Sequence, residues 1–129
     1  MELKIMSEIR TKLFSFPFSV ADIEKGPVIE WDFFTLRLKF TDYLENHCEV
    51  TFRDVSHFEF LVEDELDAKN YPSDGAVQVL DSPLIAKLVE IGELTEEESK
   101  DFQHLVVGFN GIGSFLVVVY RDLDSRILR

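Results

Sequence analysis

One cysteine and three histidines are the side chains with which this sequence could bind a transition metal or activate a nucleophile: Cys48, His47, His57 and His104. Their spacing lacks the two close pairs of ligands that are typical of a zinc site. Covalent catalysis would require His57 or His104 to fold back onto Cys48. Because Cys48 has inward parity on its predicted strand, we expect a buried structural thiol, with no catalytic residue, metal or cofactor.

An acidic run is the second candidate site. Four carboxylates fall within five residues at Glu63, Asp64, Glu65 and Asp67, and Glu59 lies on the predicted strand before them. The run lacks the alternating ligands and the glycine of a calcium-binding EF-hand loop. Such runs are typical of solvated strand ends, but they can also contact a basic protein. The sequence therefore predicts a partner-binding site at Glu59, Glu63, Asp64, Glu65 and Asp67.

Two further motifs are explained by local structure. The run Thr95-Glu96-Glu97-Glu98 matches a capping box, and carboxylates in a first helical turn complement the helix dipole. The glycine-containing run Asn110–Gly113 suggests a phosphate-binding loop, but no helix N-terminus follows it to supply backbone donors. We interpret it as a hairpin turn.

The elements that position these side chains are mainly strands. Residues 34–41, 48–53 and 58–62 alternate apolar and polar side chains, which predicts a three-stranded antiparallel meander. The apolar residues share one face if Leu38 pairs with Val50. They also share one face across the next turn if Phe52 pairs with Phe58.

The segments before the meander predict a helix and an irregular strand. Apolar residues at helical spacing predict an amphipathic helix over residues 3–13. Ile29, Trp31 and Phe33 alternate in the opposite parity to the strand that starts at Phe34. We therefore expect a β-bulge or a strand break at Phe33-Phe34.

The segments after the meander predict two helices and two strands. Ser82 and Pro83 suit the start of a helix that Gly92 ends, and a short helix follows the capping box to about Phe102. Strands are predicted at residues 105–109 and 114–120. The segment 115–120 is apolar on both faces, so both must be covered, the second by the N-terminal segment or a second subunit.

These elements predict a single α+β domain spanning residues 1–129. We expect a mainly antiparallel sheet of five to six strands with two to three helices packed against it. The single cysteine indicates a reducing compartment. The longest uncharged run, residues 105–120, is too short and too turn-like to span a membrane, and no signal peptide is evident. We expect a cytoplasmic protein.

The net charge of −12 is distributed unevenly. Residues 1–40 hold six acidic and six basic side chains, whereas residues 41–101 hold seventeen acidic and four basic ones. Residues 102–129 hold two acidic and three basic side chains. Such a distribution repels nucleic acid and anionic lipid and attracts basic proteins, so we expect neither a nucleic-acid nor a membrane partner.

Four short runs in order resemble small uncharacterised bacterial proteins of the toxin-immunity type. They are Phe52–Val55, Glu63–Glu65, Val79–Ser82 and Val107–Asn110, and the resemblance covers about residues 48–120. It implies a small α+β protein that acts by binding, and it carries over no functional residue. Inhibitors of basic toxins commonly present a carboxylate-rich face that steers association.

The leading hypothesis is therefore a non-enzymatic binding protein whose acidic face contacts a basic protein, as an immunity-type inhibitor would. One alternative is a small enzyme or ligand-binding protein with a pocket in the curved sheet and Cys48, His57 or His104 at its mouth. Another is a homo-oligomeric structural module that associates through the apolar strand 115–120.

Overall fold

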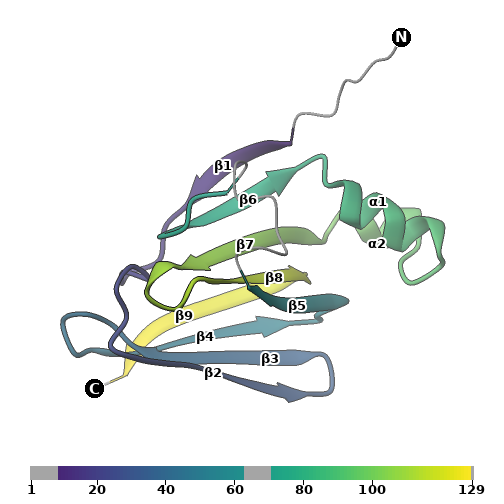
Figure 1. Cartoon of the computed structure of the whole chain (residues 1–129). Coiled ribbons are helices and arrows are strands. Elements are labelled where there is room, and N and C mark those ends of the chain that lie inside the picture. The colour runs from purple at the N-terminus through teal and green to yellow at the C-terminus, as the bar shows by residue number, and fades with distance from the viewer. Residues whose placement is uncertain (1–8, 63–70, 129) are drawn as a thin grey trace, which may run out of the picture.

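The alternating residues of this chain form two antiparallel β-sheets, one above the other (Figure 1). The computed structural model describes residues 9–62 and 71–128. In these residues the elements are β1 (Arg10–Phe14), β2 (Lys25–Asp32), β3 (Thr35–Thr41), β4 (His47–Arg53), β5 (His57–Val62), β6 (Ala76–Leu80), α1 (Pro83–Glu90), α2 (Glu96–Ser99), β7 (Gln103–Phe109), β8 (Ser114–Tyr120) and β9 (Asp122–Leu128). The mainly antiparallel architecture is confirmed, but nine strands in two sheets replace the single sheet of five to six strands.

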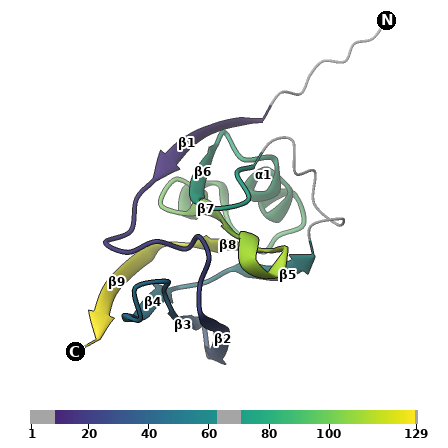
Figure 2. The same cartoon turned by 60° about the vertical axis from the view of Figure 1, so that its left-hand side comes forward.

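The two sheets pack face to face over a shared apolar core. The five-stranded sheet has the order β1-β6-β7-β8-β5, and the four-stranded sheet has the order β2-β3-β4-β9; Figure 2 shows the same two layers from another side. Phe52 of β4 packs edge-to-face on Tyr120 of β8, with ring centroids 5.1 Å apart. Buried side chains from both sheets fill this core, among them Leu36, Leu38, Val50, Leu105, Val107 and Leu116.

The first half of the predicted meander is confirmed. β3 pairs with β4 in the expected register, with Leu38 opposite Val50. The strand break expected at Phe33-Phe34 is a two-residue turn, because Asp32 pairs with Thr35 directly across it. Ile29 and Trp31 therefore lie on the same face of the sheet as Leu38 and Leu36, which resolves the opposite parity, whereas Phe33 and Phe34 are exposed in the turn.

The predicted pairing in the second half of the meander is wrong. β5 pairs with β8 of the other sheet, and the free edge of β4 is taken by β9. The chain changes sheets within two residues: the amide of Val55 donates to the carbonyl of Phe34, and the amide of Ser56 donates to the carbonyl of Val119. Alternation within β5 fits either partner, so local pattern could not choose between them.

The prediction of a helix over residues 3–13 is also wrong for the part of it that the structure describes. Residues 10–14 form β1, which pairs with β6 so that Arg10 lies opposite Leu80. Residues 1–8 lie outside the described part of the chain. The free edge of β6 offers backbone hydrogen bonds to this segment, and such tertiary pairing overrides a weak local helical preference.

Both later helices are confirmed. The Ser82 hydroxyl caps α1 by accepting from the Ile85 amide at 3.0 Å, and Pro83 is the first helical residue. Thr95 and Glu98 form the expected capping box at α2. Leu88 and Leu94 form a cluster with Val119, which fixes the helical segment to the outer face of β8.

The chain itself covers both faces of β8. All seven of its residues are buried. Leu116 and Val118 point into the core between the sheets, whereas Phe115 and Val117 belong to a second cluster with Val106 on the outer face. The feature that motivated a homo-oligomer is thus explained without a second subunit.

Neither helix in the described ranges is long and apolar enough to cross a membrane.

Candidate functional site

The predicted partner-binding residues are only partly described by the structure. Glu59 is exposed on β5, and its Oε2 lies 2.6 Å from Nε2 of His57. Glu63, Asp64, Glu65 and Asp67 fall in residues 63–70, outside the described part of the chain. The acidic run therefore stays a prediction.

Cys48 lies in the core between the sheets. It is 1% exposed, and its Sγ donates to the carbonyl oxygen of Asn46 at 3.5 Å. Burial, followed by the nearby Asp42 carboxylate, raises the pKa of the Cys48 thiol to about 11. A thiol with this pKa is protonated at neutral pH, so it lacks the thiolate that nucleophilic attack requires. Within residues 9–62 and 71–128 no three His, Cys, Asp or Glu side chains gather as a metal site.

His104 is the buried histidine of the five-stranded sheet. Its Nδ1 lies 2.7 Å from the Ser82 hydroxyl. The same hydroxyl accepts from the Ile85 amide, so Ser82 connects the His104 ring to the first turn of α1. Burial, followed by the charge of His57, lowers the pKa of His104 to about 4, while Glu59 opposes the shift. His104 is therefore neutral at physiological pH.

The Ser82–His104 pair has the atoms of a nucleophile and its base, but its surroundings favour an anchoring role. The residue after Ser82 is Pro83, which has no backbone N–H to stabilise an oxyanion. The Ser82 hydroxyl is also occupied in the helix cap, because it accepts from the Ile85 amide. The pair caps α1 and ties its first turn to β7.

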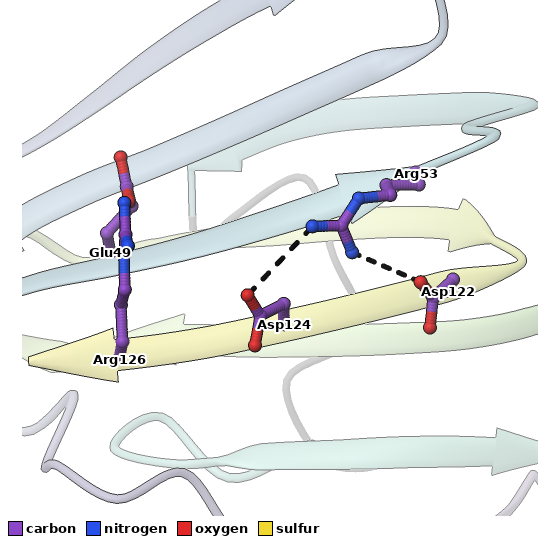
Figure 3. Close-up of polar contacts among 5 residues, drawn as sticks. All are labelled: Glu49, Arg53, Asp122, Asp124 and Arg126. Atoms are coloured by element: carbon purple, nitrogen blue, oxygen red, sulfur yellow. Dashed lines mark hydrogen bonds and ion pairs between the residues drawn. The ribbon is translucent and has the colours of Figure 1, made fainter.

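The outer face of the four-stranded sheet is charged but internally paired. Figure 3 shows Arg126 lying along Glu49, and Arg53 beside Asp122 and Asp124. Arg126 donates from Nε and Nη2 to one oxygen of Glu49, at 2.9 and 2.8 Å, and leaves Glu49 only 7% exposed. Arg53 lies 3.1 Å from Asp122 and 3.9 Å from Asp124.

The four strands of this sheet have no net charge. They hold five acidic and five basic side chains: Glu30, Asp32, Glu49, Asp122 and Asp124 against Lys25, Arg37, Lys39, Arg53 and Arg126. Lys39 lies opposite Glu49 in the register of β3 and β4, but each forms its ion pair with another residue, since Lys39 binds Glu30 at 3.2 Å. Charges paired in this way leave little field for a partner.

The helical segment, residues 83–101, differs from this sheet. It holds six acidic side chains, all exposed, against two basic ones: Glu90, Glu93, Glu96, Glu97, Glu98 and Asp101 against Lys87 and Lys100. The only ion pair within the segment joins Glu97 to Lys100 at 3.6 Å. The capping box uses one oxygen of Glu98, as the sequence predicts. The segment therefore has a net charge of −4, and no further ion pair joins its carboxylates to residues 9–62 or 71–128.

A groove of about 340 Å³ lies beside the helical segment. Glu93, Leu94, Glu98 and Phe102 line one side, and Phe34, Asp54, Val55, Ser56 and Arg121 line the other. Arg121 lies over the Phe102 ring at 5.0 Å and pairs with Asp54 at 3.6 Å, so the groove's single cation is engaged. An acidic rim with apolar walls results.

The turn at the groove carries unusual residues. Phe33 and Phe34 have φ values of 40° and 65°, a left-handed conformation that costs roughly 1–2 kcal/mol per residue without glycine. Their side chains are 85% and 63% exposed. Strain and exposed aromatic area at one turn motivate a functional hypothesis. The parity conflict in the sequence marked this turn, whereas the groove joins segments far apart in the chain and gave no sequence signal.

Comparison of the chain with protein-family models, curated proteins and solved structures finds no match. The resemblance to immunity-type proteins stays a prediction.

Proposed function

We propose that this protein is a non-enzymatic binding protein that presents an acidic face to a basic protein partner, as an immunity-type inhibitor would. The observation that carries the proposal is the unpaired acid of residues 90–101 beside the groove. Unpaired exposed charge steers association, and a desolvated aromatic contact at the centre supplies binding energy. The partner surface that fits combines Lys or Arg side chains with an apolar anchor.

The groove refines where the partner binds. Phe34, Leu94 and Phe102 offer an apolar wall for the anchor, and the carboxylates of Asp54, Glu93 and Glu98 surround it. The predicted acidic run at Glu59, Glu63, Asp64, Glu65 and Asp67 belongs to the same proposal as a second acidic contact. It can be tested separately by Lys substitutions there.

A random-peptide display selection provides a probe. Selected peptides should carry net positive charge and at least one aromatic or aliphatic residue. Affinity is then measured by fluorescence anisotropy on a variant with Glu90→Gln, Glu93→Gln and Asp101→Asn. We expect binding about tenfold weaker at low salt, with a smaller difference at high salt because screening weakens the lost attraction.

The matched control removes the same charge from the four-stranded sheet through Glu30→Gln, Asp122→Asn and Asp124→Asn. Its affinity should stay within about twofold of the unchanged protein, since those carboxylates already face cations. Equal weakening in the two variants would show that total charge, not the helical end, governs binding.

A further inference from the structure

A second cavity lies on the other side of α2, with a volume of about 610 Å³. It is bounded by the end of β6, the start of β7 and both helices. Its size falls within the range of about 300–1,000 Å³ that small-molecule sites occupy. Its lining differs in chemistry from the acidic groove.

The polar part of the lining centres on Gln78 and Gln103, which are the only glutamines in the chain. They come from neighbouring strands, since Gln78 pairs with Leu105 two residues beyond Gln103. Both are half-buried, and neither side-chain amide has a hydrogen-bond partner within residues 9–62 and 71–128. An amide offers a donor and an acceptor side by side, which matches the edge of a planar heterocycle such as adenine.

The remaining lining selects for an uncharged planar molecule. Ile85, Ala86, Val89 and Phe102 supply apolar and aromatic surface. The charged members of the lining are Asp81, which pairs with Arg10, and Glu96. No Lys, Arg or His lines the cavity among the described residues, so a phosphate there would be repelled by the Glu96 carboxylate and would find no lining cation to bind.

We infer that this cavity binds an uncharged purine-like heterocycle, a base or nucleoside, whose donor–acceptor edge the Gln78 and Gln103 amides read. Phe102 supplies the aromatic surface for the ring. Nucleotides are excluded by the carboxylates. The cavity shares Phe102 with the acidic groove, but the two amides that read the ligand, Gln78 and Gln103, lie outside the groove.

The test is a titration with adenosine, followed by ligand-observed NMR, with AMP as the charged comparison. Adenosine should bind saturably, and AMP should bind at least about tenfold more weakly. Gln78→Met and Gln103→Met keep side-chain length but remove the amide, and each should weaken adenosine binding about tenfold. Arg37→Met, on the outer face of β3, is the control and should leave binding unchanged.

Ala86→Leu provides a second test that does not depend on whether the two strand variants fold. Ala86 is exposed on α1 and lines the cavity, so leucine there is compatible with the helix and should block the ligand. The inference is overturned if adenosine does not saturate below ~10 mM, if AMP binds as tightly, or if the Met variants or Ala86→Leu bind as the unchanged protein does.

Discussion

The outer face of the four-stranded sheet and the helical segment carry similar numbers of carboxylates but use them differently. On the sheet, antiparallel register brings four of the five acids beside a base of a neighbouring strand, and Glu49 is nearly enclosed by Arg126. In the helical segment, Glu97 is the only acid with an ion pair among the described residues, and its partner is Lys100. The difference shows that net charge alone does not identify a binding surface, because pairing decides which charges a partner can use.

The largest expected effect tests whether the two regions share one core. Phe52 is fully buried between the sheets, so Phe52→Ala should lower the free energy of unfolding by about 3–5 kcal/mol. Denaturant unfolding is followed by Trp31 fluorescence for the four-stranded sheet and by amide exchange at Leu88 for the helical segment. Both signals should shift together; separate transitions would mean that the regions are independent units.

The second prediction concerns the pH dependence of stability, which His104 beside the helical segment should control. The pKa of His104 is about 4 in the folded protein, below its ordinary value of 6.5, because the ring is buried. The unfolded chain therefore takes up a proton between pH 6.5 and 4 that the folded chain does not, and stability falls as pH falls, by on the order of 3 kcal/mol. Unfolding measured across this range should show a shallower loss in His104→Gln. Parallel pH profiles would rule out this role for His104.

The third prediction concerns pairing. Arg126→Met leaves the buried Glu49 carboxylate without its cation and should cost about 1 kcal/mol. Glu93→Gln removes an exposed carboxylate without an ion pair and should change stability by less than about 0.5 kcal/mol. Thermal unfolding of both variants makes the comparison. If Glu93→Gln lowered the unfolding temperature more than Arg126→Met does, our assignment of Glu49 as paired and Glu93 as unpaired would be wrong.

The smallest expected effect is a gain in stability. Phe33→Asn combined with Phe34→Gly suits the left-handed turn and should stabilise the protein by roughly 0.5–1 kcal/mol. The same change removes exposed aromatic surface and should weaken binding of the selected peptides. If the variant is less stable than the unchanged protein, the packing of the Phe34 side chain contributes more to stability than its backbone strain costs.

Local signals in the sequence predicted local structure well. The Leu38–Val50 register, the Ser82 cap and the capping box at Thr95 follow from neighbouring residues, and each is observed. The division into two sheets depends on which edge each strand joins. On β9 the inward-facing residues are Leu123, Ser125 and Ile127, and the serine interrupts their apolar pattern. The sequence therefore did not indicate β9, which occupies the edge of β4 that was predicted for β5.

The candidate site was less predictable for a related reason. The acids at residues 96–98 were correctly explained as a helix cap, but the fold also places Glu98 in one groove with Phe34, which comes much earlier in the chain. The unusual parity at Phe33-Phe34 marked the turn without indicating its exposure. Convergence of distant segments depends on the sheet change at Val55 and Ser56, which alternation does not encode.

The most direct test of the account is to map a selected basic peptide onto the protein by amide chemical shifts. We expect the changes to fall on Phe34, Asp54, Glu93 and Phe102 around the groove. The amides of Glu49, Asp124 and Arg126 should stay unchanged. Changes confined to the four-stranded sheet would contradict the claim that unpaired acid at the helical end forms the binding surface.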